Sequence, residues 1–310
     1  MPVIAVAGGS GPVGRTIVEA LVIHGGHTVH VLSRTDRPLK DGVKFLKVDY
    51  SDVEAMSRAL AESKIDIIIC AIGVFSPESS QVQQNLILAA EKSITTNKFL
   101  VASFDMLHLR EHIGLNPLAR YTYEALDLLE AETSLVHTRI ACGWFADYYG
   151  VPHYPSHLHP WINVVNMAKC RAIVPGDGSG RADFITTQDM AAYVARLMDL
   201  EQWQKVSNIT GDTMSLNELV HLAEETRGVK FDVAYDSLEK LKAGTISFFE
   251  DFPPIGLEDG FGDEAFYALI HRQAGMNHFL VPREHTLNDE FPDVKRKTVA
   301  EVMQQSWGGR

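Results

Sequence analysis

The chain has 310 residues, enough for two structural units at roughly 150 residues per domain. Its 45% hydrophobic and 22% charged residues exclude a disordered or collagen-like chain. Its 28 basic and 40 acidic side chains give a net charge of -12, which disfavours nucleic acid and anionic membrane surfaces as partners because both are negatively charged.

The first half of the chain alternates short apolar runs with longer segments of helical period, a pattern typical of strand–helix units around a parallel sheet. Strands are predicted at Val3–Ala7, Thr28–Ser33, Lys44–Val48, Ile65–Ala71, Lys98–Ser103 and Leu135–Ala141. Helices are predicted at Val13–His24, Val53–Glu62, Gln81–Lys92 and Leu118–Glu132. Because the strands are nearly continuous apolar runs, as buried parallel strands are, residues 1–150 are predicted to form an α/β domain with a doubly wound parallel sheet.

After about Trp144 the regular alternation stops, and residues 151–310 are predicted to form a smaller mixed α/β part, discontinuous, with some strands rejoining the first sheet. Helices are predicted at Thr187–Leu200, Ser215–Arg227 and Thr298–Gln305, and a short strand at Ser207–Thr210. Asp183 and Asp189 flank the first of these helices and are expected to fix its N-terminus. Gly244–Gly262 is predicted to be a loop, either over a binding cleft or on a plain surface.

A glycine-rich segment joins the first strand to the first helix. Its residues are Gly8, Gly9, Ser10, Gly11, Pro12, Val13 and Gly14. Such glycines allow a tight turn and a close approach of the backbone to a pyrophosphate, and the helix N-terminus offers free amide donors. Because the motif lies within a strand–helix–strand unit, we expect a Rossmann-type domain that binds a dinucleotide. Gly8 and the residues from Ser10 to Gly14 are expected to contact it. The alternative is a glycine turn that merely fits the fold.

The residues after the second strand favour NADP over NAD. An NAD enzyme places an acid there for the ribose hydroxyls, whereas this chain has Ser33 and Arg34, and a guanidinium matches a ribose 2′-phosphate. Arg37 is expected to help bind the 2′-phosphate, whereas the acidic Asp36 argues against the preference for NADP. The alternative is that Arg34 is only a solvated surface charge.

Two further segments are expected to border the cofactor. Asp49 and Tyr50, after the third strand, are placed to contact the adenine, with helix capping by the residues that follow as the alternative. Ala71, Ile72 and Gly73 end the fourth strand, where the chain passes close to the ribose and nicotinamide.

At this point the sequence resembles the atypical short-chain dehydrogenase/reductases of the NmrA-like and isoflavone-reductase-like type. The resemblance rests on the glycine segment, the Ser33-Arg34 pair, and the runs Phe99–Ser103, Thr138–Asp147 and Ala182–Thr186 with Gln188–Met190. It implies a monomeric or homodimeric NADP-binding protein that holds a small-molecule substrate between the Rossmann half and the C-terminal part. Reductases of this group often carry a catalytic Lys early in the helix before strand six, but this chain has no Lys between Lys98 and Lys169. The proton donor is therefore unassigned.

Candidate catalytic residues follow from position along the sheet. Ser103 ends the fifth strand, at the edge where open parallel sheets bind ligands. It is a candidate to donate to a substrate oxygen and is also expected to contact the nicotinamide. The alternative is that its hydroxyl only bonds to the backbone at the strand end. Tyr121 and Tyr123 are candidate acids, with packing as the alternative. Arg120 cannot act as a general acid, because it stays protonated, but it is a candidate to orient substrate.

Aromatic and His residues after strand six are candidates for the substrate and nicotinamide site. Trp144 and Phe145 are expected to form a wall of this site. His153, His157 and Trp161 are predicted to line a pocket for an aromatic substrate. The alternative for these three residues is a surface loop. No metal site is predicted there, because prolines break any helix that would align the His side chains.

The apolar runs are about half the roughly 20 residues that cross a bilayer, and no basic-then-apolar leader begins the chain, so a cytoplasmic protein is expected. Three functions are consistent with these observations. The favoured one is an NADPH-dependent reductase of a small, aromatic or polycyclic carbonyl, enone or imine. The others are a non-redox isomerase, dehydratase or cyclase with the same fold, and an NADP-sensing regulator.

Overall fold

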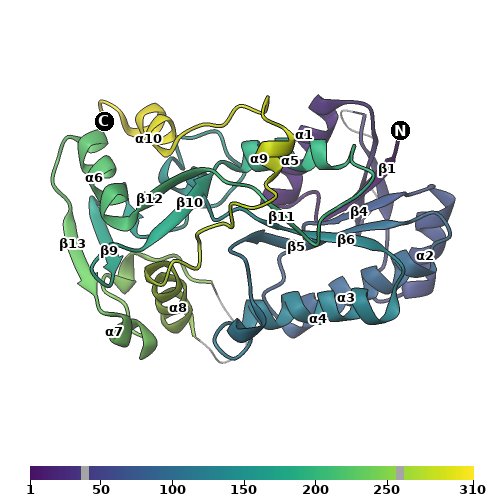
Figure 1. Ribbon diagram of the computed structural model, residues 1–310, viewed down its shortest axis with the longest axis horizontal. Coiled ribbons are helices and arrows are strands. Elements are labelled where there is room, and N and C mark those ends of the chain that lie inside the picture. The colour runs from purple at the N-terminus through teal and green to yellow at the C-terminus, as the bar shows by residue number, and fades with distance from the viewer. Residues whose placement is uncertain (36–41, 256–261) are drawn as a thin grey trace.

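The computed structural model describes residues 1–35, 42–255 and 262–310, and its centre is a parallel sheet in the order β11-β6-β5-β4-β1-β2-β3 (Figure 1). The strands are β1 (Val3–Ala7), β2 (Thr28–Ser33), β3 (Lys44–Lys47), β4 (Ile67–Cys70), β5 (Lys98–Asp105), β6 (Val136–Ala141) and β11 (Val206–Asn208). The doubly wound fold predicted from the sequence is confirmed. The strand order reverses between β1 and β4, and the carboxyl ends of these strands form the crevice where open α/β sheets bind ligands.

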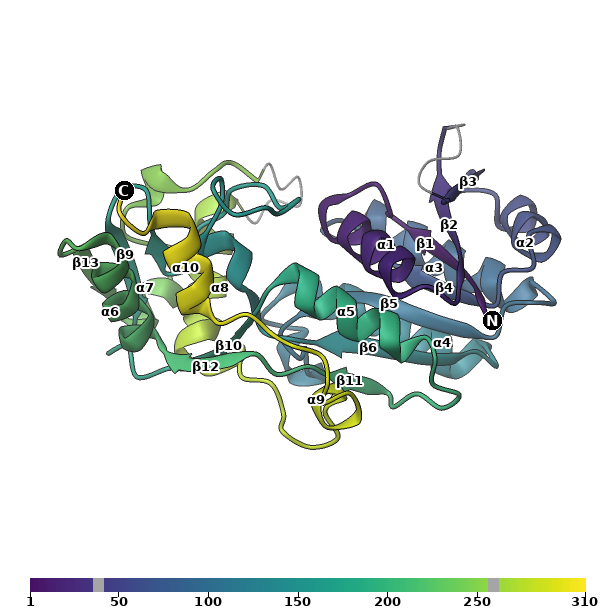
Figure 2. The same ribbon diagram turned by 90° about the horizontal axis from the view of Figure 1, so that it is seen from above.

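Helices cover both faces of this sheet. One face carries α1 (Pro12–His24) and α5 (Thr187–Leu197), which lie side by side in Figure 2, and the other carries α2 (Val53–Glu62), α3 (Pro77–Lys92) and α4 (Pro117–Glu132). Successive side chains of a strand point to opposite faces of the sheet, and each face has its own hydrophobic core. In β1, Val6 packs on the side of α1 and Ala7 on the side of α3. Among the described residues, none of the helices has the length and apolar character needed to span a bilayer.

Two elements differ in extent from the prediction. Helix α3 starts four residues before the predicted Gln81, because Ser76 caps it by accepting from the Ser79 amide at 3.3 Å and Pro77 takes the first helical position. Strand β5 continues past Ser103 to Asp105, with a shift in its register against β6 between Leu100 and Phe104. This irregular stretch carries the end of β5 into the site described below.

The second part adds two small sheets, in the orders β12-β10-β7 and β13-β9-β8. Their strands are β7 (Trp144–Phe145), β8 (Val165–Asn166), β9 (Arg171–Pro175), β10 (Arg181–Ile185), β12 (Asp212–Ser215) and β13 (Asp232–Asp236). The helices are α6 (Leu216–Arg227), α7 (Leu238–Lys242), α8 (Asp263–Gly275), α9 (Leu287–Glu290) and α10 (Val299–Trp307). The predicted helices α5, α6 and α10 and the predicted strand β11 are present, and β11 does rejoin the first sheet beside β6.

The predicted loop from Gly244 is largely confirmed in its described part, because residues 244–255 contain only a 3-10 turn at Phe249–Asp251. Residues 256–261 lie outside the described residues. The position of this segment over a cleft stays a prediction.

Asp183 has a different role from the one expected. Its buried carboxylate accepts from the Val281 amide at 2.7 Å and from Arg283 Nη2 at 2.9 Å, so it anchors the chain before α9. The N-cap of α5 is Thr186, whose hydroxyl accepts from the Asp189 amide. The Asp189 carboxylate accepts from the Lys297 amide at 2.8 Å. Both acids therefore hold the C-terminal segment in place.

All three cysteines are free thiols; Cys70 and Cys142 are buried, and Cys170 is half-buried. Burial raises the pKa of the Cys70 thiol to about 12, so this thiol is unreactive near neutral pH.

Candidate active site

The glycine turn after β1 leaves the first amides of α1 free for an anion. Gly8 has a φ of +76°, and a Cβ there would lie 2.5 Å from the Ala71 carbonyl oxygen. A Cβ on Gly14 would lie 2.2 Å from the Gly8 carbonyl oxygen. Gly11 caps α1 without a side-chain hydrogen bond to its first turn. The geometry therefore fits a phosphate at the N-terminus of α1.

Ser33 and Arg34 lie at the carboxyl end of β2, near Tyr50. The Tyr50 hydroxyl donates to the Leu32 carbonyl over 3.4 Å, which holds the phenol against β2. Burial raises the pKa of Tyr50, and the positive charge of Arg34 opposes that rise. Arg34 is exposed and stands at the edge of the sheet expected to receive the adenosine ribose. Asp36 and Arg37 lie outside the described residues.

Asp49 stabilises a turn. Its carboxylate accepts from the Ser51 amide at 2.9 Å and the Ser51 hydroxyl at 2.6 Å, and these bonds lower the pKa of Asp49. The N-cap of α2 is Asp52, which accepts from the Ala55 amide at 2.8 Å. The capping alternative therefore holds for Asp52, and contact of Asp49 with the adenine stays a prediction.

A cavity of about 380 Å³ opens where the carboxyl ends of β4 and β5 meet the second part of the chain. The first half contributes residues of the α1 start, the β4 end and the β5 end, including Pro12, Val13, Ala71, Ile72, Gly73 and Ser103. The chain from β7 onward contributes Trp144, Phe145 and Trp161 among the predicted residues. The structure thus brings the predicted cofactor-binding turn and the predicted aromatic wall to one cavity, which we call the central cavity.

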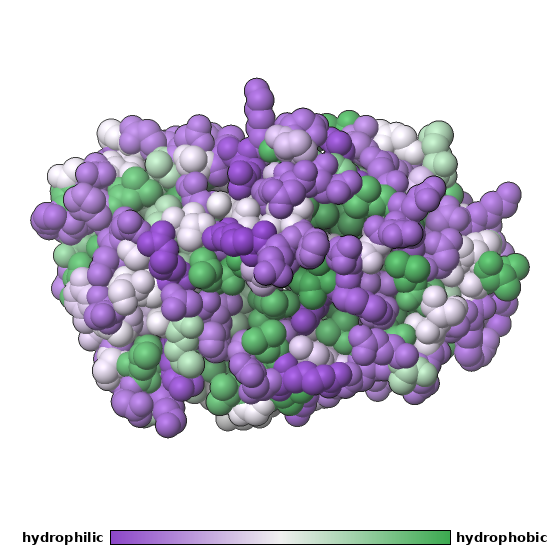
Figure 3. Space-filling view, viewed as in Figure 1, coloured by the Kyte–Doolittle hydropathy of each residue, from purple (hydrophilic) through white to green (hydrophobic). Residues whose placement is uncertain are grey.

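Aromatic side chains form most of the far wall of the central cavity. Trp144 packs against Phe279 with ring centroids 4.3 Å apart, and Phe145 contacts Tyr148 at 6.4 Å. Trp161 packs on Tyr267 at 4.8 Å. The outer surface seen in Figure 3 differs from this aromatic wall, because its hydrophobic residues lie in small groups among hydrophilic ones. The interior of the cavity is therefore suited to a substrate with apolar rings.

Four polar groups face this apolar space from β5, the loop that follows it, and α4. His108 is buried, and its Nε2 lies 3.2 Å from Asp105 Oδ2. The Ser103 hydroxyl lies 3.5 Å from Asp105 Oδ1 and equally far from the Ile140 carbonyl, so both contacts are long. The Tyr121 hydroxyl is buried and has no hydrogen-bond partner among the described residues. These groups offer proton donors and acceptors close to the expected nicotinamide position.

The structure does not bring four of the predicted residues to the central cavity. Arg120 is half-exposed and pairs with Glu124 one helical turn later, and the Tyr123 hydroxyl donates to the His108 carbonyl at 3.3 Å. His157 pairs with Glu19 of α1 at 2.8 Å, and His153 packs edge-on against Trp307. These side chains instead tie neighbouring elements together, and a role for them in the reaction or in substrate binding stays a prediction.

His108 and Asp105 were not singled out from the sequence. Asp105 ends β5 and His108 lies three residues beyond it. Both are at the sheet edge that binds ligands in open α/β folds, so their position in the sequence could have indicated them. The contact between them depends on the bend of the chain after Asp105, which no local pattern announces. Arg139 of β6 supports this bend, because its guanidinium donates to the His108 carbonyl at 2.9 Å.

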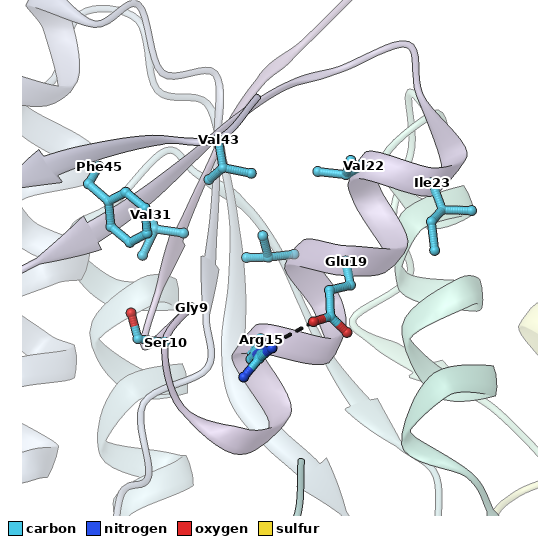
Figure 4. Close-up of a pocket in the computed structure, with 10 residues that line it drawn as sticks. Gly9, Ser10, Arg15, Glu19, Val22, Ile23, Val31, Val43 and Phe45 are labelled. Carbon is cyan, nitrogen blue, oxygen red and sulfur yellow. Dashed lines mark hydrogen bonds and ion pairs between the residues drawn. The ribbon is translucent and has the colours of Figure 1, made fainter. Parts of the chain in front are cut away.

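A second cavity, of about 350 Å³, lies on the α1 side of β2 and β3 (Figure 4). Gly9 and Ser10 of the turn border it at one end, and Val31, Val43 and Phe45 form its apolar wall. Arg15 and Glu19 of α1 form an ion pair at 3.1 Å on its other side. The glycine turn therefore separates two cavities, and the group of polar side chains from β5, the loop that follows it, and α4 lies in the central one.

Comparison with known proteins agrees with this geometry. Residues 2–256 match the model of the NmrA-like family. The chain is 30% identical to "Oxidoreductase swnN" of Metarhizium robertsii, over 99% of this chain and 98% of the relative. It is 24% identical to "Bifunctional pinoresinol-lariciresinol reductase 1" of Linum usitatissimum, over 78% of this chain and 76% of the relative.

Among solved structures, the complex of leucoanthocyanidin reductase from Vitis vinifera with NADPH superposes with a TM-score of 0.75. It is 18% identical and covers 98% of this chain and 99% of that chain, so it supports the fold. The resemblance stated from the sequence is confirmed, and the chain belongs to the NmrA-like family.

Proposed function

We propose that this protein is an NADPH-dependent oxidoreductase that reduces a small, aromatic or polycyclic carbonyl, enone or imine. The observation that carries the proposal is the central cavity, which has the glycine turn and the end of β4 on one side and aromatic walls on the other. The names of the relatives, an oxidoreductase and a pinoresinol-lariciresinol reductase, support the same class of reaction.

The cofactor site fits NADPH, which supplies a hydride when bound. The close approaches at Gly8 and Gly14 leave no room for a side chain beside the α1 N-terminus, so its amides can receive the pyrophosphate. Arg34, exposed at the end of β2, would bind the ribose 2′-phosphate. Ala71, Ile72 and Gly73 line the central cavity, where they would border the nicotinamide.

His108 is our candidate for the missing proton donor. When a C=O or C=N group gains a hydride at carbon, its oxygen or nitrogen must gain a proton. An imidazole can give and regain a proton near neutral pH, and Asp105 at 3.2 Å would orient the ring. Ser103 and Tyr121 would donate hydrogen bonds to the substrate, which positions its carbon.

A second candidate function is acid–base chemistry without redox change, such as isomerisation or dehydration. The His108–Asp105 pair favours it, because such a pair can move a proton without a hydride. The absence of a Lys from Phe99 to Ala168 is consistent with a departure from the reductases of the group.

The test has two stages. Fluorescence titration with NADPH and NADH comes first, and tighter NADPH binding is expected. The protein with NADPH is then offered aromatic ketones, enones and cyclic imines, while nicotinamide absorbance and product mass are followed. Loss of nicotinamide absorbance with a product two mass units heavier supports the reductase. A product with no absorbance change favours the second candidate. Nucleotide binding without any product would contradict both and favour a regulatory protein.

A further inference from the structure

The turn between α1 and β2 places two imidazoles on one side of the chain. It reads His24-Gly25-Gly26-His27, and both glycines have positive φ, +72° and +78°. An added Cβ would meet nothing within 4 Å at either position, so the backbone conformation, and not crowding, favours glycine. The turn brings the two rings into a stacked arrangement with centroids 5.5 Å apart.

A carboxylate from a distant part of the sequence faces both rings. Asp199 follows α5, and the packing of α5 beside α1 places it there (Figure 2). His24 Nε2 lies 2.8 Å from Asp199 Oδ2, and His27 Nε2 lies 3.3 Å from Asp199 Oδ1. One potential ligand atom from each of the three residues lies within 4.8 Å of the other two.

His27 is the residue that this arrangement leaves unsatisfied. Its side chain is only 2% exposed, and neither ring nitrogen has a hydrogen-bond partner among the described residues. A buried polar group without a partner is costly, and in native proteins it points to an unseen ligand or water.

We propose that His24, His27 and Asp199 bind a divalent transition metal ion, with Zn²⁺ as the best match. Two imidazole nitrogens and one carboxylate oxygen are typical zinc ligands, whereas Mg²⁺ and Ca²⁺ prefer oxygen. Metal–ligand distances of about 2.0 Å put tetrahedral ligand atoms about 3.3 Å apart. The two imidazoles lie 2.8 and 3.3 Å from different oxygens of Asp199, so the carboxylate either binds through both oxygens or turns to present one oxygen to the ion. His24 and Asp199 are exposed, which leaves them room to rotate toward the ion. Water would take the fourth position.

The site lies far from the reaction centre in the sheet. His27 precedes β2 and Asp199 follows α5, at the amino ends of the strands, whereas the central cavity lies at their carboxyl ends. A bound ion would join the α1–β2 turn to the end of α5 and so stabilise the face of the sheet that these two helices cover. This role is independent of the proposed reaction.

The test is equilibrium dialysis and calorimetric titration of the full chain, without a histidine tag, against Zn²⁺. We expect one ion per chain and at least a tenfold weaker affinity in H24A and in D199N, since each loses a ligand at an exposed position. Co²⁺ in place of Zn²⁺ should give the visible absorption of a four-coordinate site in the natural chain and not in the variants.

The matched control is H221A, which removes an exposed His paired with Glu225 on α6. It should bind Zn²⁺ like the natural chain. NADPH titration should be unchanged in all variants, which separates this proposal from the proposed function. No zinc binding by the natural chain, or equal binding by H24A, D199N and H221A, would overturn the proposal.

Discussion

His108 Nε2 lies 3.2 Å from Asp105 Oδ2 inside the central cavity, and this is the closest pairing of an acid with an imidazole among the polar groups that face that space. The ring is buried, and its Nδ1 has no hydrogen-bond partner among the described residues. One nitrogen is thus held by the carboxylate, and the other is buried and lacks a partner, which a substrate bound in the central cavity would supply.

We expect H108Q to lower kcat by about 10²- to 10⁴-fold, the usual contribution of a general acid, and to leave NADPH affinity unchanged. Steady-state kinetics on the substrate found by the screen would measure this. H153Q is the matched control, because His153 packs on Trp307 outside the cavity. Full turnover by H108Q would rule out His108 as the proton donor and return attention to Tyr121 and Ser103.

R34A should lower the affinity for NADPH about tenfold or more, because a charge-assisted hydrogen bond contributes about 1.5–3 kcal/mol, and leave NADH affinity nearly unchanged. Fluorescence titration gives the ratio of the two constants. The exposed Arg58 of α2 is a suitable control, and R58A should bind both nucleotides normally. An unchanged NADPH to NADH ratio in R34A would mean that Arg34 does not contact the 2′-phosphate.

G14A should weaken nucleotide binding and lower the melting temperature together, since its Cβ would lie 2.2 Å from the Gly8 carbonyl oxygen and force α1 away from the turn. G114A is the control, because a Cβ there meets nothing within 4 Å and its φ is not positive. Calorimetry and NADPH titration of both variants check the prediction. Normal binding by G14A would show that the turn is not under the constraint inferred here.

Stability should fall in mild acid because of His271. This ring is buried on α8, where its Nε2 accepts from the Val164 amide at 3.2 Å and burial lowers its pKa to about 4. The unfolded chain binds a proton near the ordinary pKa of about 6.5, so the stabilisation is complete above that pH. It is lost as the pH falls from about 6.5 to about 4, and it amounts to about 3 kcal/mol.

Urea unfolding at several pH values would measure that loss. H271Q removes the titration, so its unfolding free energy, although lower overall, should depend less on pH in this window. H221A, at an exposed site, should keep the natural slope. Equal slopes for H271Q and the natural chain would assign the acid sensitivity to other histidines.

The first half of the fold was readable from the sequence because buried parallel strands such as β1 and β4 are continuous apolar runs and Gly8 to Gly14 separate a strand from a helix. The small sheets were not, because β7 and β8 have two residues each and carry no period. Trp161 lines the central cavity, whereas His157 pairs with Glu19 of α1, a contact that no local pattern reveals. The His24-Gly25-Gly26-His27 spacing is visible in the sequence, whereas Asp199 joins it only through helix packing.

Strand β11 has a consequence for how the chain can be divided. It pairs with β6, so the seventh strand of the nucleotide-binding sheet comes from residues beyond 150, as does α5, which covers α1. A fragment ending at residue 150 would expose the backbone edge of β6 and the apolar side of α1 to water, a combination that promotes aggregation. We therefore expect that the first 150 residues do not fold alone and that the two halves unfold in one cooperative step.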